Sequence, residues 1–312
     1  MKARHTFSLA FLASLLLTGG LAADDEEISA QLNSAKKRAT EQSCTLRYRF
    51  TAGEDVRWKV VHLGTTETTI QGNVQTAKAR TTSTKSWKIT EVDDEGNATF
   101  VHSVPEINMW QKLSGRPEVR YDSSKDEAPP RQYREVAKTV GVPIATVTIS
   151  PTGKVVKRGD SKKSTSFGLG DIAIPMPEKP VKPGDKWSTT DEIRVREADG
   201  RVKRIKTRLI YELEKVQTGV ATISVDTEVL TPVNDPKVKS QLVQQLTTGN
   251  IKFDVDAGRP ISRQIDWDET VVGFNGADSM MKYLARFTEE LLPGDATAST
   301  DAGPELTGPK IR

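Results

Sequence analysis

The chain has 312 residues, of which 45 are Lys or Arg, 42 are Asp or Glu and one is Cys. The formal net charge of +3 is a small margin between large opposed counts, which argues against a nucleic-acid partner. A single cysteine excludes a disulfide framework and a thiolate metal cluster. The basic run of residues 201–208 is typical of a solvated strand face, and an anionic partner is the alternative.

The first 22 residues have the pattern of a secretory signal peptide. Lys2 and Arg4 precede eleven mostly apolar residues at 7–17, and small residues follow up to Ala22. This run is too short for a spanning helix, which needs about 20 apolar residues, and no later stretch approaches that length. We therefore expect cleavage near Ala22 or Ala23 and a periplasmic or secreted chain without a transmembrane segment.

Two terminal segments do not have the composition of a packed core. Residues 23–43 are rich in charge and poor in large apolar side chains, which predicts a helical or disordered leader. Residues 293–312 are rich in Pro, Gly, Ala and Thr, which predicts a disordered tail.

Between these segments, apolar and polar residues alternate. In "ATISVDTEV" at 221–229 one face is apolar and the other is polar, as in a strand that is buried on one side. Turns rich in Gly, Asp, Asn and Pro separate such runs, as at 93–97, 151–154 and 256–260. The chain is therefore expected to be mainly β, or α+β at most.

Helical patterns are few. Residues 131–140 end before Gly141 and Pro143, and residues 236–248 lie between Pro236 and Gly249, which predicts one short helix in each stretch. Residues 278–291 fit either a helix or a strand. We favour a strand, because it would continue the alternation before it.

Two parts of the chain repeat the same order of elements. "AGEDVRW" at 52–58 and "KPGDKWS" at 182–188 each place Gly, an acid and Trp before a strand, and each is followed by a long hairpin, a helix and a second hairpin. This predicts two β-rich pseudo-repeats, at 44–159 and 182–292, joined by a Pro-rich bridge at 160–181. The repeats could be two domains in series, or one strongly curved sheet or half-barrel with the helices on its open side. We favour the curved sheet.

The motifs "IPMPEKPVKPGDKW" at 174–187 and "LRYRFTAGEDVRWKV" at 46–60 carry a resemblance. The chain resembles a family of secreted bacterial proteins of unknown function, found especially in planctomycetes. The resemblance implies an extracytoplasmic β-rich protein without an assigned activity or catalytic residues. A looser architectural similarity is to the periplasmic lipoprotein-carrier fold, a half-closed barrel with a helical lid.

The expected mature chain has two histidines, His62 and His102, and both alternate in phase with apolar residues. One interpretation is a core or rim histidine in each case. The other is that both face one cavity and bind a ligand there. Two imidazoles alone make a weak metal site, and "DVDAG" at 254–258 lacks the final acid of a calcium loop, so neither a metal nor a cofactor is expected.

The segment "INMWQKLSG" at 107–115 has no counterpart in the second repeat. Ile107, Met109 and Trp110 in it are candidates for an apolar ligand site, together with His102 and His62. The acids of "DWDE" at 266–269 could perform acid–base chemistry, although solvent exposure is their usual role.

Three functions follow, in order of preference. The first is an extracytoplasmic, non-enzymatic binding protein that holds an apolar small molecule or lipid in the concavity of the curved sheet. The second is an envelope scaffold that contacts other envelope proteins and has no pocket. The third is a hydrolase that uses the carboxylates at 266–269. The sequence does not indicate the ligand or the oligomeric state.

Overall fold

The computed structural model describes residues 43–159, 172–197 and 199–294, all within a compact unit of residues 43–312. The expected signal peptide, most of the leader and tail, and the first part of the bridge lie outside the described residues. No helix in the described ranges is long and apolar enough to cross a membrane.

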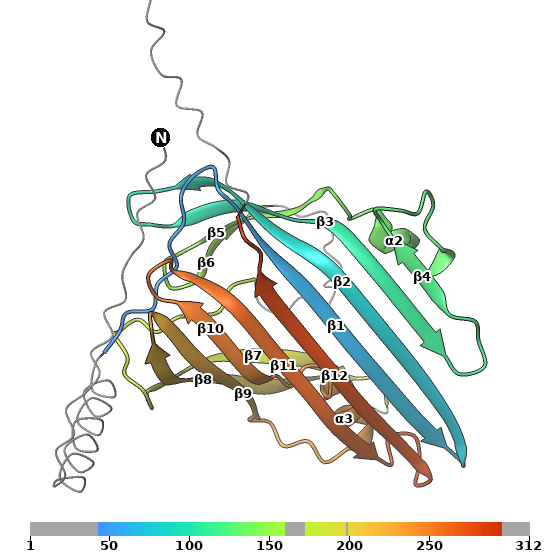
Figure 1. Cartoon of the computed structure of the whole chain (residues 1–312). Coiled ribbons are helices and arrows are strands. Elements are labelled where there is room, and N and C mark those ends of the chain that lie inside the picture. The colour runs from blue at the N-terminus through green and yellow to red at the C-terminus, as the bar shows by residue number, and fades with distance from the viewer. Residues whose placement is uncertain (1–42, 160–171, 198, 295–312) are drawn as a thin grey trace, which may run out of the picture. The chain divides into compact units, whose positions relative to one another are not determined.

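Twelve strands form one antiparallel sheet that does not close on itself (Figure 1). The order across it is β6-β5-β3-β2-β1-β12-β11-β10-β9-β8-β7, and β4 pairs with β3 outside this path. The strands are β1 Asp55–Ile70, β2 Asn73–Val92, β3 Ala98–Leu113, β4 Val119–Asp122, β5 Pro143–Ile149, β6 Val155–Arg158, β7 Lys186–Arg196, β8 Val202–Gln217, β9 Val220–Val229, β10 Thr248–Asp254, β11 Arg259–Val272 and β12 Ser279–Leu291. The expectation of a mainly β chain with one continuous curved sheet is confirmed.

The order of the strands repeats within the sheet. The first half contributes β6-β5-β3-β2-β1 and the second contributes β11-β10-β9-β8-β7, so corresponding strands occupy corresponding places. Along the chain, a helical segment follows β3 and β4 in the first half and follows β9 in the second half. Strand β12 has no counterpart and joins the halves, since it pairs with β1 on one side and β11 on the other.

The turns that open the two halves have the same geometry. Gly53 and Gly184 have φ of 90° and 93°, a left-handed conformation that favours glycine. The Gly53 N–H donates to the carbonyl oxygen of Ile89 at 2.9 Å, and the Gly184 N–H donates to that of Leu213 at 2.7 Å. Ile89 and Leu213 each donate back to the residue after the glycine, and their strands both bulge directly afterwards. The repeated phrase therefore encodes a repeated turn.

The two tryptophans of this phrase are not structural equivalents. Trp187 lies opposite Tyr211, and the corresponding position in the first half, opposite Trp87, is occupied by Val56. Trp58 lies two residues further along β1 and is fully buried. It nevertheless packs into the core, as Trp187 does against Tyr211, so a packing function in each half is supported.

The helical segments are shorter than their sequence patterns. In the first half, the 3-10 turn η1 (Arg131–Tyr133) and the single helical turn α2 (Arg134–Ala137) replace the helix expected at 131–140. In the second half, α3 (Pro236–Leu242) begins after the capping residue Asp235, whose side chain accepts a hydrogen bond from the Lys237 N–H at 2.8 Å.

Gly249 does not end this helix as expected but lies within β10. A Cβ at this position would overlap the carbonyl oxygen of Gln264 on β11. The glycine is therefore required by close strand contact, and the helix ends seven residues earlier. The ambiguous segment at 278–291 is the strand β12, as favoured from its alternation.

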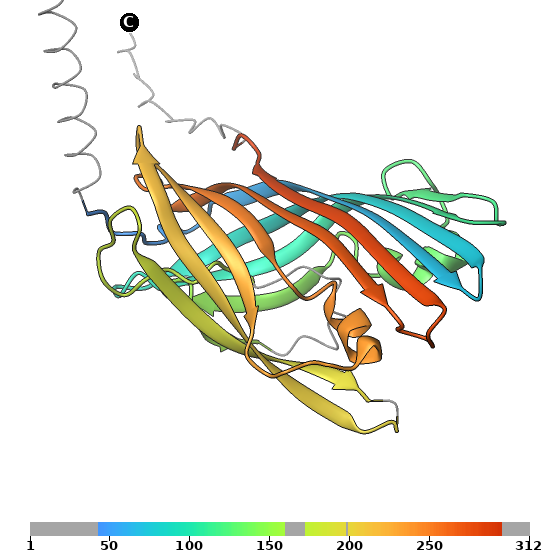
Figure 2. The ribbon, with the colours of Figure 1, turned by 90° about the horizontal axis from the view of Figure 1, so that it is seen from below.

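The curvature of the sheet gives it an inner and an outer face. Inner-face side chains from both halves form the main core together with Leu46 from the segment before β1; they include Trp58, Trp87, Ile89, Phe100, Val147, Ile149, Leu213, Ile223, Ile251 and Phe253. The described part of the bridge packs against this core and is held there by two hydrogen bonds. The Ile174 N–H donates to the hydroxyl of Tyr48 at 2.9 Å, and the Trp187 indole donates to the carbonyl oxygen of Pro175 at 2.8 Å. In the view from below, α3 lies on the open side of the curved sheet, between β11 and β7, and the β1–β2 hairpin extends past it (Figure 2).

Candidate functional site

The inner face continues past the main core toward the tips of the long hairpins. His62, Thr81 and Met109 are direct neighbours in one row across β1, β2 and β3. The next two positions of β1 and β2 on this face are small: Gly64 lies opposite Ala79, and Thr66 opposite Ala77. These side chains are half-buried or exposed, which contrasts with the filled core behind them.

Larger side chains border this stretch of small residues on the β11 and β12 side. Trp267 of β11 lies opposite Ala285 of β12, and Ala285 in turn lies opposite Gly64 of β1. Tyr283 and Met281 continue the row along β12, and the ring of His62 meets that of Trp267 edge to face with centroids 6.0 Å apart. We call this surface, from His62 and Met109 to Trp267 and Tyr283, the inner track.

The second half covers the equivalent part of its inner face. Val238 and Leu242 of α3 are buried against Val195 and Ile205, and the next residue, Val243, is buried against Tyr283 at the edge of the inner track. In the first half, the η1–α2 segment instead packs at the β3–β4 edge, where Tyr133 stacks on Tyr121. The shorter helical segment therefore leaves more of the first half's inner face half-exposed.

The structure places the five residues proposed from the sequence in different surroundings. His62 and Met109 share one row of the inner track, and Ile107 lies one pair closer to the core on the same face. Trp110 projects from the outer face, because neighbours along a strand point to opposite sides. These residues therefore do not line one site.

His102 is a core residue. It is 7% exposed, it lies opposite Trp87, and its Nδ1 is 3.3 Å from the carbonyl oxygen of Ser86. Burial lowers its pKa, and the nearby Lys85 lowers it further. Burial also lowers the pKa of His62. Both imidazoles are therefore biased toward the neutral form, and of the two only His62 reaches the inner track.

A buried group of charges lies where the core meets the inner track. Lys85 of β2 contacts Glu289 of β12 as an ion pair, and Arg263 of β11 lies 3.5 Å from the other carboxylate oxygen. The Lys85 ammonium also lies 4.4 Å from the ring centroid of Trp58 and 4.9 Å from that of Trp87. We call Lys85, Glu289 and Arg263 the ion cluster.

Mutual attraction decides the charge states in this cluster. Burial acts to raise the pKa of Glu289, but Lys85 and Arg263 outweigh it and hold the pKa below its ordinary value. Burial lowers the pKa of Lys85, and Glu289 opposes that shift. With one carboxylate between two cations, the cluster carries one uncompensated positive charge.

The sequence reasoning missed the ion cluster, although a signal was present. Lys85 alternates in phase with Trp87 and Ile89, and Glu289 alternates with Phe287, so each charge falls on an apolar face. Only the fold shows that β2 and β12 flank β1 on either side and so bring these charges together, because 204 residues separate Lys85 and Glu289 along the chain.

Two buried N–H groups beside the inner track have no hydrogen-bond partner among the described residues. They are Nε of Arg263 and Nε1 of Trp267. A buried donor without an acceptor costs about 1–3 kcal/mol, so such groups call for an explanation. An acceptor on a bound molecule would satisfy them.

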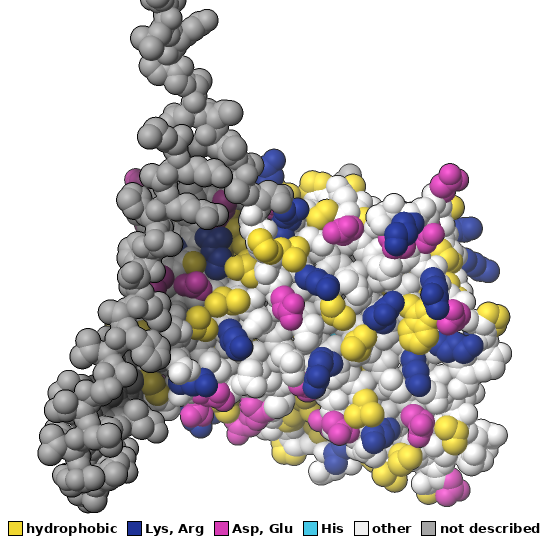
Figure 3. Space-filling model, in the orientation of Figure 1, with side chains coloured by type: hydrophobic (Ala, Val, Ile, Leu, Met, Phe, Trp, Pro, Cys, Tyr) yellow, Lys and Arg dark blue, Asp and Glu magenta, His cyan; other side chains and the backbone are white. Residues whose placement is uncertain are grey.

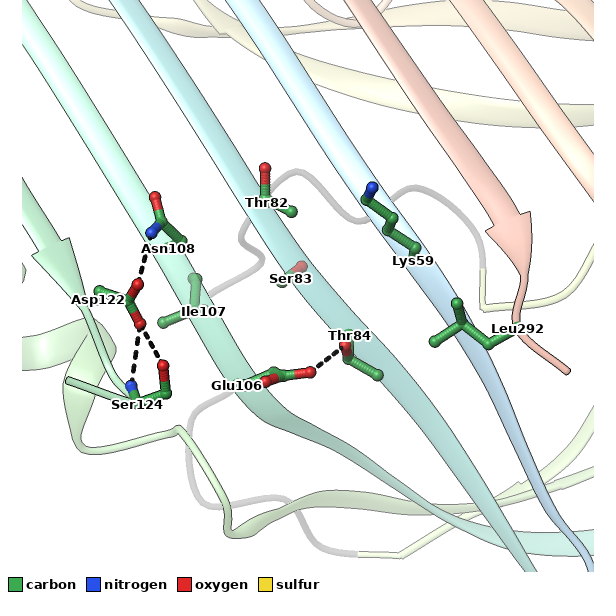
Figure 4. Close-up of a pocket in the computed structure, with 10 residues that line it drawn as sticks. All are labelled: Lys59, Thr82, Ser83, Thr84, Glu106, Ile107, Asn108, Asp122, Ser124 and Leu292. Atoms are coloured by element: carbon green, nitrogen blue, oxygen red, sulfur yellow. Dashed lines mark hydrogen bonds between the residues drawn. The ribbon is translucent and has the colours of Figure 1, made fainter. Parts of the chain in front are cut away.

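The outer face has two shallow hollows. The first, of about 320 Å³, is lined by Lys59, Thr82, Ser83, Thr84, Glu106, Ile107, Asn108, Asp122, Ser124 and Leu292 (Figure 4). Its carboxylates are already engaged, since Thr84 donates to Glu106, and both Asn108 and Ser124 donate to Asp122. The hydrogen bonds from Ser124, its hydroxyl first, and from Asn108 lower the pKa of Asp122 to about 2. The hollow therefore holds carboxyl groups that neighbouring donors fix in place.

The second hollow, of about 360 Å³, surrounds Trp110. It is lined by Leu63, Gly64, Thr65, Lys78, Ala79, Arg80, Trp110, Glu118 and Arg120. The Trp110 indole donates to Glu118 at 3.1 Å, which orients the ring. This bond, aided by Arg120, lowers the pKa of Glu118. Figure 3 shows the outer face with Lys and Arg side chains among hydrophobic ones.

The acids at 266–269 are divided between the two faces. Asp266 and Asp268 share the outer face, where Arg286 Nε donates to Asp266 at 2.6 Å and Gln264 donates to it at 2.7 Å. Burial acts to raise the pKa of Asp266, but these two donors hold it below the ordinary value. Glu269 points to the inner face, opposite Tyr283. Asp266 is thus an ion-paired carboxylate.

Other reactive groups are few in the described ranges. Burial raises the pKa of Cys44, which lowers the fraction of reactive thiolate. No group of three or more His, Cys, Asp or Glu side chains that could hold a metal ion occurs among the residues with described positions.

Comparison with known proteins finds similar solved structures and a matching family model. A solved structure titled "Lipid-protein interactions in lipovitellin" aligns with 78% of this chain at 12% identity and a TM-score of 0.46. The alignment covers 26% of that chain, so this chain spans about a quarter of its length. No curated protein matches. Residues 161–266, which include the motif at 174–187, match the model of DUF6263, a family of unknown function.

Proposed function

We propose that this chain is an extracytoplasmic, non-enzymatic binding protein that holds an elongated apolar ligand against the inner track. The single observation that carries the proposal is the arrangement of that track: small residues between larger apolar ones, on a concave face that the first half's helical turn does not cover. Such a surface matches a narrow apolar chain better than a bulky polar solute.

The ion cluster and the unpaired donors define a polar end for this ligand. Arg263 and Glu289 lie one pair closer to the core than His62, on the same face. The uncompensated positive charge and the two unpaired N–H groups favour a ligand with one anionic or hydrogen-bond-accepting head. We therefore propose a molecule of the fatty-acid or lipid type, with its head toward Arg263 and its apolar body toward Tyr283.

The first test is extraction of the protein purified from its own cells with organic solvent, followed by mass spectrometry. We expect a co-purifying amphipathic molecule. In a direct assay, a fluorescent fatty acid should bind the delipidated protein at micromolar concentration. Absence of both an extracted molecule and probe binding would refute the proposal.

A matched pair of variants locates the ligand. Ala79→Trp places a tryptophan on the inner track, and Thr270→Trp places one on the outer face of β11. We expect Ala79→Trp to weaken probe binding at least about tenfold, which corresponds to about 1.4 kcal/mol, and Thr270→Trp to leave it unchanged. Equal affinities in the two variants would place the ligand elsewhere.

The open sheet favours one alternative, an envelope scaffold. The eleven-residue strand β7 pairs only with β8 among the described strands. Its other edge therefore offers backbone groups to an added strand, except at Arg196, whose N–H and carbonyl oxygen bond to the side chain of Gln241. Pull-down of an envelope protein that is lost when Thr190, near the middle of β7, is replaced by Pro would support this alternative over ligand binding.

A further inference from the structure

Two of the three cations that line the hollow around Trp110 lack ion-pair partners among the described residues. Lys78 and Arg80 line it, and neither forms an ion pair with a carboxylate in the part of the chain that the structure describes. Arg120 contributes a third cation, and Glu118 is the one acid in the lining. The lining therefore has a net charge of +2.

A fourth cation makes this arrangement unfavourable for the free protein. Lys112 of β3 lies directly opposite Lys78 of β2, in the register position next to the pair of Trp110 and Arg80. Like charges directly opposite each other destabilise an antiparallel pair. An anion bound between Lys78 and Lys112 would attract both ammonium groups and offset their mutual repulsion.

The other basic strand of the protein differs in this respect. On β8, Arg204 lies 3.5 Å from Glu192 of β7, and Arg208 lies 3.6 Å from Glu228 of β9. Neighbouring acids thus neutralise these cations, as in an ordinary solvated sheet face. Around Trp110 only Arg120 has such an acid, Glu118 at 2.7 Å, whereas Lys78, Arg80 and Lys112 form no ion pair among the described residues, so this group is the stronger candidate for an anionic partner.

Apolar side chains accompany the cations on the outer face. Leu63 lines the hollow and is 43% exposed, and Leu284, opposite Thr65 at its edge, is 38% exposed. Trp110 presents an amphipathic ring, the type that gathers where an apolar phase meets water. A free phosphate ion would interact only with the cations, whereas a lipid surface would interact with both the cations and the exposed apolar side chains.

We propose that this surface, which comprises Leu63, Lys78, Arg80, Trp110, Lys112 and Arg120, docks on an anionic lipid membrane. Lys and Arg contact lipid phosphates, and Trp110 and Leu63 enter the headgroup region. The surface is on the opposite side of the sheet from the inner track, so membrane docking is independent of the proposed ligand. Each can fail while the other holds.

Vesicle co-sedimentation of the mature chain tests this proposal. We expect binding to phosphatidylcholine vesicles that contain phosphatidylglycerol, weak binding to phosphatidylcholine alone, and loss of binding in high salt. Each cation near an anionic surface contributes about fivefold to partitioning, so Lys78→Ser/Lys112→Ser should weaken it about 25-fold. Removing the repulsion should leave this variant at least as thermally stable as the parent.

The matched control is Arg204→Ser/Arg208→Ser, which removes the same charge from the outer face of β8. This variant should retain vesicle binding within about threefold. Trp110→Ser should weaken vesicle binding about tenfold, and this loss should not depend on salt concentration, because it removes an apolar contact and no charge. Equal losses in both double variants would show a net-charge effect and overturn the proposal. Binding to a soluble acidic polysaccharide, without binding to vesicles, would assign the surface to a glycan and also overturn it.

Discussion

Replacing Glu289 by Gln removes the one negative charge of the ion cluster at almost constant volume. Glu289 is 5% exposed, contacts Lys85 and lies 3.5 Å from Arg263. At an effective dielectric constant of about 20, opposite charges about 4 Å apart attract by about 4 kcal/mol. The variant loses these attractions and leaves two cations buried together.

The expected loss in the free energy of unfolding is about 3–5 kcal/mol, the range for removing one partner of a buried ion pair. With a dependence of about 3 kcal/mol per molar urea, the unfolding midpoint should fall by roughly 1–1.7 M. Glu290→Gln is the matched control, since Glu290 is the exposed neighbour on the outer face, and it should change stability by less than about 0.5 kcal/mol.

The pH dependence provides a second measurement on the same pair. The pKa of Glu289 is depressed in the folded state, so its stabilisation is complete above the ordinary Glu pKa of about 4.3 and is lost as the pH falls through the lower folded value. The difference between wild type and Glu289→Gln should be constant from about pH 7 to pH 5 and shrink below about pH 4. A difference under 1 kcal/mol at neutral pH would refute the account of the cluster.

Three further outcomes follow. Replacing all three members of the ion cluster by apolar residues of similar size should leave urea stability unchanged or raised by about 1–4 kcal/mol, and a loss as large as that of Glu289→Gln would contradict this. Gly153→Ala should cost at least about 2 kcal/mol more than Gly72→Ala in thermal unfolding: both have similar positive φ, but only at Gly153 would the Cβ lie 2.5 Å from the carbonyl oxygen of Ile174. Stability should decline as the pH falls below about 6.5, because burial lowers the folded pKa of His102 and the unfolded chain takes up the proton first; His102→Gln should flatten that decline, and an unchanged slope would show that other groups cause it.

The strands and their duplication could be read from the sequence because both depend on local information. Alternation marks which side of a strand is buried, and the glycine of each opening turn is required by a positive φ that is set within a few residues. The same local rules predicted helices longer than those in the structure. Gly249 has the position of a helix terminator, but its role is set by Gln264 on a neighbouring strand.

The candidate site was only partly accessible from the sequence. His62 and Met109 were proposed from alternation and from the broken repeat, and the fold places them in one row. Trp110 was grouped with Met109 by proximity along the chain, although adjacent strand residues face opposite ways. Attention to that rule would have separated the inner track from the outer surface.

The sequence by itself determined that this protein is built from antiparallel strands in two similar halves, because backbone turns and side-chain alternation act over a few residues. Only the tertiary structure decided that β12 joins the halves and that Lys85, Arg263 and Glu289 meet between them. Lys85 comes from β2, far along the chain from β11 and β12, which carry the other two residues, and strand order is set by the packing of the whole sheet. That packing also decided which parts of the two faces are buried and which remain exposed.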